Sequence, residues 1–167
     1  MEDRDFMVQA LALARQALEA GEFPVGCVVA LEGRVVATGS RSGTADGGRN
    51  ETDHAEMTAL RRFQRLDDLD AARAKATVYC TLEPCLMCFG AILISGIHRI
   101  VYAYEDVMGG GTGCNLKTLN PLYREAEMNV VAGVLRSESL QLLKAYFSNP
   151  KTDYWRGSLL ARHTLSL

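Results

Sequence analysis

Apolar residues recur at helical spacing at the start of the chain and then give way to β-branched runs. The first pattern predicts an amphipathic helix over residues 3–20, ended by Gly21. Its apolar stripe consists of Phe6, Ala10, Leu13, Ala14 and Ala17. The runs GCVVAL and RVVATG that follow are joined by Glu32 and Gly33, a pattern typical of a β-hairpin.

A polar segment rich in Ser, Gly, Asp, Thr and Asn extends from Ser40 to Thr52 and predicts a long loop. Long loops in compact domains are often functional. A second helix is predicted after it, with Asp53 as the expected N-cap. Its apolar residues lie at helical spacing: Ala55, Ala59, Leu60, Phe63 and Leu66.

Strand and helix patterns alternate through the rest of the chain. ATVYCT, HRIVYAY and MNVVAGVL predict strands, and SESLQLLKAYF predicts a closing helix. The helix PCLMCFGAILIS has Pro84 in its expected first turn and stops near Gly96. This alternation favours an α/β layered fold with a mixed sheet. We expect one domain over residues 1–150, with residues 151–167 as a C-terminal extension that belongs to the same domain or contacts a partner.

The composition is that of an ordinary globular protein, with 167 residues, 48% of them hydrophobic, and a net charge of −2. This charge does not indicate bulk electrostatic binding to nucleic acid. The N-terminus MEDRDFMVQA lacks the features of an export signal, and no apolar run reaches the roughly 18 residues that suggest a membrane span. We therefore expect a cytoplasmic protein whose five cysteines, an odd number, are thiols or metal ligands.

Two motifs in the middle of the chain carry candidate chemistry. Cys85 and Cys88 form a C-x-x-C at the start of a predicted helix, where the helix dipole favours thiolates, the form that binds metals. His54 also lies at a predicted helix start. One imidazole and two thiolates suit Zn²⁺ and leave a fourth position open for a catalytic water. Glu56 would take a proton from that water and pass it to a departing amine.

Each motif alone has a less specific interpretation. H-x-E can reflect the preference of acidic residues for first turns, and C-x-x-C can be a redox pair or half of a structural zinc ribbon. The chain has no second C-x-x-C, and a structural zinc would need a fourth protein ligand such as Cys114 or His98. Together, H-x-E followed by P-C-x-x-C is the signature of zinc deaminases that act on nucleobases.

Four segments, GEFPVGCVV, DHAEMTALR, TVYCTLEPCLMCFGAI and HRIVYAYED, resemble the cytidine deaminase superfamily over nearly the whole chain. The resemblance is to the branch that contains tRNA adenosine deaminases and bacterial guanine deaminases. It implies a three-layer α/β/α sandwich around a five-stranded mixed sheet, and members of this family are commonly homodimers.

The resemblance also implies roles for particular residues. It implies one zinc per chain with a catalytic water as fourth ligand, and Glu56 as the proton shuttle. The zinc ligands that it implies are His54, Cys85 and Cys88. The base pocket that it implies is lined by the GEFPVG loop, which contains Pro24 and Val25, and by the backbone N–H of Ala55.

The substrate-binding positions match this branch less well. Where the tRNA-acting enzymes typically carry an asparagine after the second strand, this chain has Arg41, and Asn50 further along the loop is a candidate substitute. The stretch PLYREAEMN also lacks the family's pattern. Basic and aromatic residues near the C-terminus are candidates for a local RNA-binding face. They include Arg124, Lys144, Lys151, Arg156, Arg162, Tyr154 and Trp155.

We therefore expect hydrolytic deamination of a free small molecule, a purine such as guanine or an adenosine-type nucleoside. The alternative is deamination of the wobble adenosine of tRNA. A third interpretation, from another class, is a catalytically silent zinc-bearing subunit that serves binding or assembly. Glu56 argues against this third interpretation, because a silent subunit can dispense with it.

Overall fold

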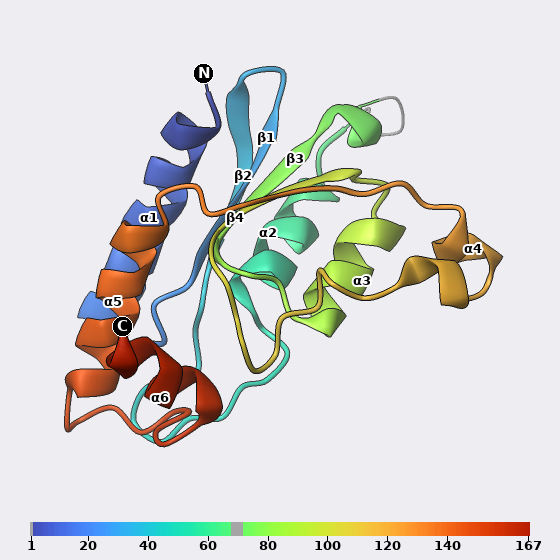
Figure 1. The fold of residues 1–167 in the computed structure, drawn as a ribbon. Coiled ribbons are helices and arrows are strands. Elements are labelled where there is room, and N and C mark those ends of the chain that lie inside the picture. The colour runs from blue at the N-terminus through green and yellow to red at the C-terminus, as the bar shows by residue number, and fades with distance from the viewer. Residues whose placement is uncertain (1, 68–71) are drawn as a thin grey trace.

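A computed structural model describes residues 2–67 and 72–167 and contains a five-stranded sheet covered by helices on both faces (Figure 1). The strands are β1 (Gly26–Leu31), β2 (Arg34–Ser40), β3 (Thr77–Leu82), β4 (Arg99–Tyr104) and β5 (Asn129–Ala132). Their order in the sheet is β2-β1-β3-β4-β5. β1 pairs antiparallel with β2 and β3, whereas β3–β4 and β4–β5 are parallel. The predicted α/β sandwich with a five-stranded mixed sheet is confirmed.

The helices form two layers. α1 (Asp3–Glu19) and α5 (Arg136–Ser148) lie side by side on one face of the sheet, while α2 (Ala55–Phe63) and α3 (Leu86–Ile94) cover the other (Figure 1). The buried side chains form two apolar clusters, one that contains α1 and one that contains α2 and α3, and α5 contributes to both. Two clusters arise because successive side chains of a strand point to opposite faces of the sheet. The short helix α4 (Pro121–Arg124) lies between β4 and β5 in the chain. The C-terminal helix α6 (Leu159–Ser166) follows α5. Among the described residues, no helix combines the length and apolar character that crossing a membrane would require.

Several predicted element boundaries were wrong by a few residues. The N-cap of α2 is His54 rather than Asp53, and the helix ends at Phe63 instead of continuing to Leu66. The helix after β3 starts at Leu86 with Cys85 as its N-cap, so Pro84 precedes the helix and is not in its first turn. β5 ends at Ala132 because Gly133 has a φ of 85°, which breaks the strand before α5.

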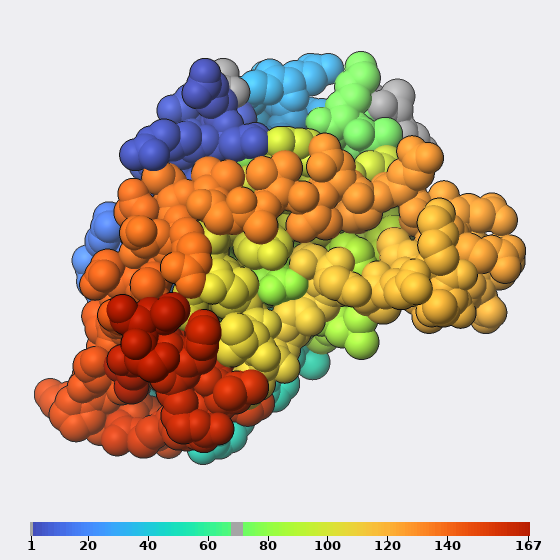
Figure 2. All heavy atoms as spheres, viewed as in Figure 1, coloured from blue at the N-terminus to red at the C-terminus, as the bar shows by residue number. Residues whose placement is uncertain are grey.

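The C-terminal residues pack on their own chain. Leu160 and Thr164 of α6 are buried, and the Thr164 hydroxyl lies 3.2 Å from the Tyr104 hydroxyl at the end of β4. The space-filling view shows α6 (red) against α5 (orange) and against the loop that follows β4 (yellow) (Figure 2). The hydrogen bond between Tyr154 and Arg41 brings the segment between α5 and α6 to the end of the sheet where α2 and α3 begin.

Candidate active site

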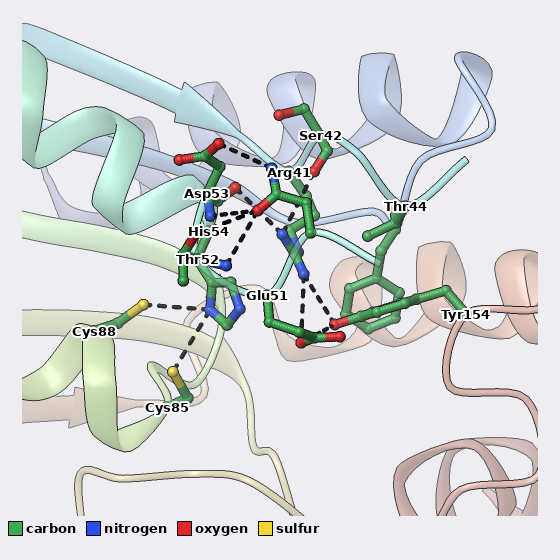
Figure 3. Close-up of polar contacts among 12 residues, drawn as sticks. Arg41, Ser42, Thr44, Glu51, Thr52, Asp53, His54, Cys85, Cys88 and Tyr154 are labelled. Atoms are coloured by element: carbon green, nitrogen blue, oxygen red, sulfur yellow. Dashed lines mark hydrogen bonds and ion pairs between the residues drawn. The ribbon is translucent and has the colours of Figure 1, made fainter. Parts of the chain in front are cut away.

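The N-termini of α2 and α3 bring three candidate metal ligands together. His54 is the N-cap of α2, Cys85 is the N-cap of α3, and Cys88 lies in the first turn of α3. The Nδ1 atom of His54 is 3.5 Å from the Sγ of Cys85 and 3.4 Å from the Sγ of Cys88 (Figure 3). All three ligand atoms lie within 4.8 Å of one another. Two helix N-termini therefore converge on one imidazole nitrogen and two sulfur atoms.

This arrangement fits zinc. Bond lengths of about 2.3 Å to sulfur and about 2.0 Å to nitrogen in a tetrahedral site require N–S separations of about 3.5 Å, close to both observed distances. A hydrogen bond with Cys88 and the proximity of His54 lower the pKa of Cys85 to about 4, although burial opposes this shift. The hydrogen bond between the two cysteines raises the pKa of Cys88. The lowered pKa of Cys85 favours the thiolate, the form that zinc binds.

A fourth protein ligand is not present among the described residues. The other candidates from the sequence lie elsewhere, since His98 Nδ1 is 3.1 Å from the backbone oxygen of Glu127 and Cys114 is not part of the ligand group. A set of three protein ligands leaves a coordination position open, which is the arrangement of catalytic rather than structural zinc sites.

Glu56 lies beside this cluster, in the first turn of α2. Its side chain is only 3% exposed, and burial raises the pKa of its carboxyl group. A raised pKa makes the carboxylate a stronger base, which suits a group that takes up and returns protons in general acid–base catalysis. The position of Glu56 next to the three ligands is therefore compatible with the proton-shuttling role expected from the sequence.

A cavity of about 220 Å³ opens above these residues. Its walls come from the β1–β2 region, from the loops after β3 and β4, and from the C-terminal segment. The lining residues include Phe23, Val25, Arg41, Glu51, His54, Glu56, Glu83, Cys85, Asp106, Met108, Tyr154, Trp155 and Leu160. This volume lies below the range of about 300–1,000 Å³ that is usual for drug-sized ligands, so the cavity suits a single base.

The structure brings some of the predicted substrate-binding residues to this cavity and not others. Val25 and Arg41 line it, whereas Pro24, Asn50 and Ala55 are not among its lining residues. The Asn50 side chain instead stabilises the loop, because its amide donates to Asp53 and its oxygen accepts from the backbone N–H groups of residues 52 and 53. Asn50 therefore does not occupy the place of the expected pocket asparagine.

Arg41 is the buried cation of the cavity wall. Its Nη2 donates a hydrogen bond of 2.9 Å to the hydroxyl of Tyr154, which in turn donates one of 3.0 Å to the carboxylate of Glu51 (Figure 3). Its Nη1 donates to the backbone oxygen of Asp53 at 3.3 Å. These contacts tie the end of β2 to the residue before His54 and to the C-terminal segment.

Other lining residues gave no signal in the sequence. Glu83 and Asp106 follow β3 and β4, and they approach each other because these two strands are parallel neighbours. The carboxylate of Glu83 accepts hydrogen bonds from the backbone N–H of Asp106 and from the hydroxyl of Thr112. Acidic residues after strands are common in sequences, and the pairing of β3 with β4 was not predicted.

Comparison with known proteins identifies the family of this chain. The model of the cytidine and deoxycytidylate deaminase zinc-binding region matches residues 1–104. The chain is similar to the tRNA-specific adenosine deaminase of Agrobacterium fabrum, with 35% identity over 89% of this chain and 95% of the relative. The corresponding protein of Bacillus subtilis is 32% identical over 87% of this chain and 89% of its own length.

Solved structures give the same result for the fold. A structure from work on A-to-I editing by tRNA:A34 deaminases matches with a TM-score of 0.62 at 31% identity, over 83% of this chain and 98% of its own. The guanine deaminase of Nitrosomonas europaea matches with a TM-score of 0.66 at 24% identity, over 86% of this chain and 83% of its own. With its open set of one histidine and two cysteines and its buried glutamate, the chain belongs to the cytidine and deoxycytidylate deaminase family of zinc-dependent hydrolases.

Proposed function

We propose that this deaminase acts on adenosine within tRNA and converts it to inosine. The observation that carries this proposal is the similarity to tRNA-specific adenosine deaminases, which extends over almost the whole chain at up to 35% identity. The sequence analysis favoured a free small molecule and kept the tRNA substrate as the alternative. The relatives support that alternative better than the preferred interpretation.

The size of the cavity is compatible with a substrate base that remains attached to RNA. A cavity of about 220 Å³ accommodates one base, so the ribose and phosphates of the same nucleotide would stay outside. Enzymes that modify a base in a polynucleotide take the base out of its stack and enclose it in a pocket of this kind. Trp155, which lines the cavity and is 40% exposed, offers an aromatic surface at its edge.

In the proposed reaction, His54, Cys85 and Cys88 would hold the metal beside the cavity. Zinc supplies Lewis acidity that makes water a nucleophile at neutral pH. Glu56 would take the two protons of the water in turn, giving one to ring nitrogen N1 and one to the amino nitrogen, so that ammonia leaves and the ring carbon gains an oxo group. Val25 and Phe23 form an apolar wall that excludes bulk water from the reacting base.

A panel of substrates tests this proposal. Ammonia release is measured with a tRNA anticodon stem-loop that carries adenosine at the wobble position, and with free adenosine, adenine, guanine and guanosine. We expect deamination of the stem-loop, confirmed by detection of inosine in the digested RNA. Release of ammonia from a free purine but not from the stem-loop would contradict the proposal.

A free aminopurine is the second candidate substrate. The observation that favours it is the C-terminal wall of the cavity, because Tyr154, Trp155 and Leu160 line the space in which the base would lie. The same panel separates the two candidates, because it contains both the stem-loop and free purines. A free base can enter without an RNA strand passing this wall.

We also propose that the protein is a homodimer. Three apolar side chains are largely exposed, with Leu86 and Ile94 of α3 at 63% and Leu122 of α4 at 70%. Gly90 lies one helical turn from each of the two α3 residues, and a methyl group there would meet no other atom. Exposed apolar patches of this kind mark association surfaces. Sedimentation equilibrium of the wild type and of Ile94→Glu measures the association, which the charged variant should weaken.

A further inference from the structure

The guanidinium group of Arg41 is buried without a close carboxylate partner. Its side chain is 3% exposed, and the nearest carboxylate oxygen, on Glu51, is 3.9 Å away on a side chain that is itself 53% exposed. Arg41 is otherwise held by neutral groups, namely the hydroxyl of Tyr154 and two backbone oxygens. Burying a charge is costly unless it is paired. A polar ligand in the cavity would compensate this charge further.

The other charged groups of the cavity wall are already engaged. Glu83 accepts hydrogen bonds from the backbone N–H of Asp106 and from Thr112, and Asp106 accepts from the backbone N–H groups of Met108 and Gly109. Glu56 lies at the metal ligands. Arg41 is therefore the cationic group that faces the substrate space among the residues lining the cavity.

An arginine can only donate hydrogen bonds. This property distinguishes it from the asparagine typical of the tRNA-acting enzymes, which both donates and accepts. In adenine, the amino group is the only hydrogen-bond donor once the ring is attached to ribose, and it must face the metal ligands. The ring nitrogens that remain, including N3 and N7, are acceptors. A group that only donates, such as the guanidinium of Arg41 in the cavity wall, therefore complements the acceptor nitrogens of this base.

We propose that Arg41 is a specificity-determining residue that donates a hydrogen bond to a purine ring nitrogen, N3 or N7, while Tyr154 and Glu51 orient its guanidinium group. This inference rests on the proposed function. Tyr154 is a positioning residue, because its hydroxyl bridges Arg41 Nη2 and Glu51 while its ring lies 5.3 Å below the guanidinium carbon. Its place in the chain, 113 residues after Arg41, makes the C-terminal segment part of substrate recognition.

The test pairs single-atom changes in the substrate with a change at Arg41. Stem-loops that carry adenosine, 3-deazaadenosine or 7-deazaadenosine at the reactive position are assayed with the wild type and with Arg41→Met. Each analogue lacks one acceptor nitrogen. Its intrinsic reactivity is the same for both enzymes, so that the ratio of the two enzymes' kcat/KM values removes this contribution. We expect the wild type to lose about 10- to 100-fold in kcat/KM on one analogue, the usual effect of a hydrogen bond to a charged group. Arg41→Met should already show this loss in kcat/KM on adenosine, compared with the wild type. It should then act on that analogue as well as it acts on adenosine.

Controls separate recognition from folding. Arg49→Met is the matched control, because Arg49 belongs to the same loop and pairs with Asp153 at 3.9 Å, but does not line the cavity. It should discriminate between the substrates as the wild type does. Tyr154→Phe keeps Arg41 and removes only the bridging hydroxyl, so it should reduce the discrimination partly. Zinc content and melting temperature are measured for all variants. If Arg41→Met does not fold, the two single variants Tyr154→Phe and Arg41→Lys replace it in the test.

The outcomes are distinguishable. The assignment of Arg41 is overturned if the change in kcat/KM on each analogue, relative to adenosine, is the same in the wild type as in the Arg41 variants. It is also overturned if the wild type loses activity on neither analogue. Either result leaves the deaminase function intact. If the wild type does not act on the stem-loop, the proposed function fails instead. The same pair of deaza changes is then made in the purine that the wild type does deaminate, where a loss independent of Arg41 overturns the inference.

Discussion

Gly39 of β2 lies directly beneath the first turn of α2, so that a Cβ atom at Gly39 would be 2.0 Å from the backbone oxygen of Ala55. The absence of a side chain at Gly39 therefore lets the helix approach the sheet closely. Because His54 and Glu56 flank Ala55, this contact also sets the position of one metal ligand and of the proposed proton carrier.

Substitution of Gly39 by alanine should displace the start of α2 and weaken the metal site. Overpacking of this kind costs about 1–3 kcal/mol of stability, and here the obstructing atom belongs to the backbone. We expect a lower melting temperature and substoichiometric zinc, measured by thermal unfolding and elemental analysis. Gly113→Ala is the control, since a Cβ there meets no atom within 4 Å. A fully zinc-loaded Gly39→Ala protein would contradict the proposed constraint.

Replacement of Glu56 by glutamine should abolish deamination and leave the metal site intact. Glutamine has nearly the same shape but cannot carry the proton, and loss of a general acid–base group costs about 10²- to 10⁴-fold in rate. Single-turnover ammonia release and zinc content are the measurements. Retention of zinc with loss of activity supports the role of Glu56. Activity within a factor of two of the wild type would exclude it.

Replacement of Cys88 by serine should remove zinc, because a hydroxyl group is a poor substitute for a thiolate ligand. The protein should also lose the stabilisation that metal binding gives the folded state, which is about 4 kcal/mol at a metal concentration 1,000 times the dissociation constant. Elemental analysis and chemical unfolding with and without added zinc measure both effects. Cys114→Ser is the matched control, since Cys114 is not part of the ligand group.

The stability of the loop at residues 43–45 should depend on pH through Glu22. Its carboxylate accepts hydrogen bonds from the Thr44 hydroxyl and from the backbone N–H groups of Gly43, Thr44 and Ala45. Burial opposes ionisation, but these hydrogen bonds, led by those from Thr44, lower the pKa of Glu22 overall. A group with a lowered pKa in the folded state contributes stability above its unfolded pKa of about 4.3, and this contribution is lost as pH falls.

The measurement is the difference in unfolding free energy between the wild type and Glu22→Gln from pH 7 to pH 3. The wild type should be more stable at pH 7, and the difference should shrink as the pH falls through the pKa of the folded carboxylate. A difference that stays constant down to pH 3 would show that ionised Glu22 does not stabilise the loop.

Much of the fold and of the chemistry was predictable because the signals are local. Helical spacing predicted α1, β-branched runs predicted the hairpin of β1 and β2, and paired motifs predicted a site with one histidine and two cysteines. The errors at helix starts have a local origin as well. Asp53 has the side chain of a good N-cap, but in the structure its carboxylate is bound to Asn50 and Arg61, and the helix begins one residue later.

The sequence by itself determined the reaction class, because the chemistry of a zinc deaminase requires particular side chains at short, recognisable spacings. Only the tertiary structure decided what surrounds the reacting base. It turned Asn50 toward its own loop, buried Arg41 in the cavity wall, and brought Tyr154 against it from the far end of the chain. Such contacts depend on how distant segments pack, and no periodicity or spacing along the chain encodes a meeting of residues 113 positions apart.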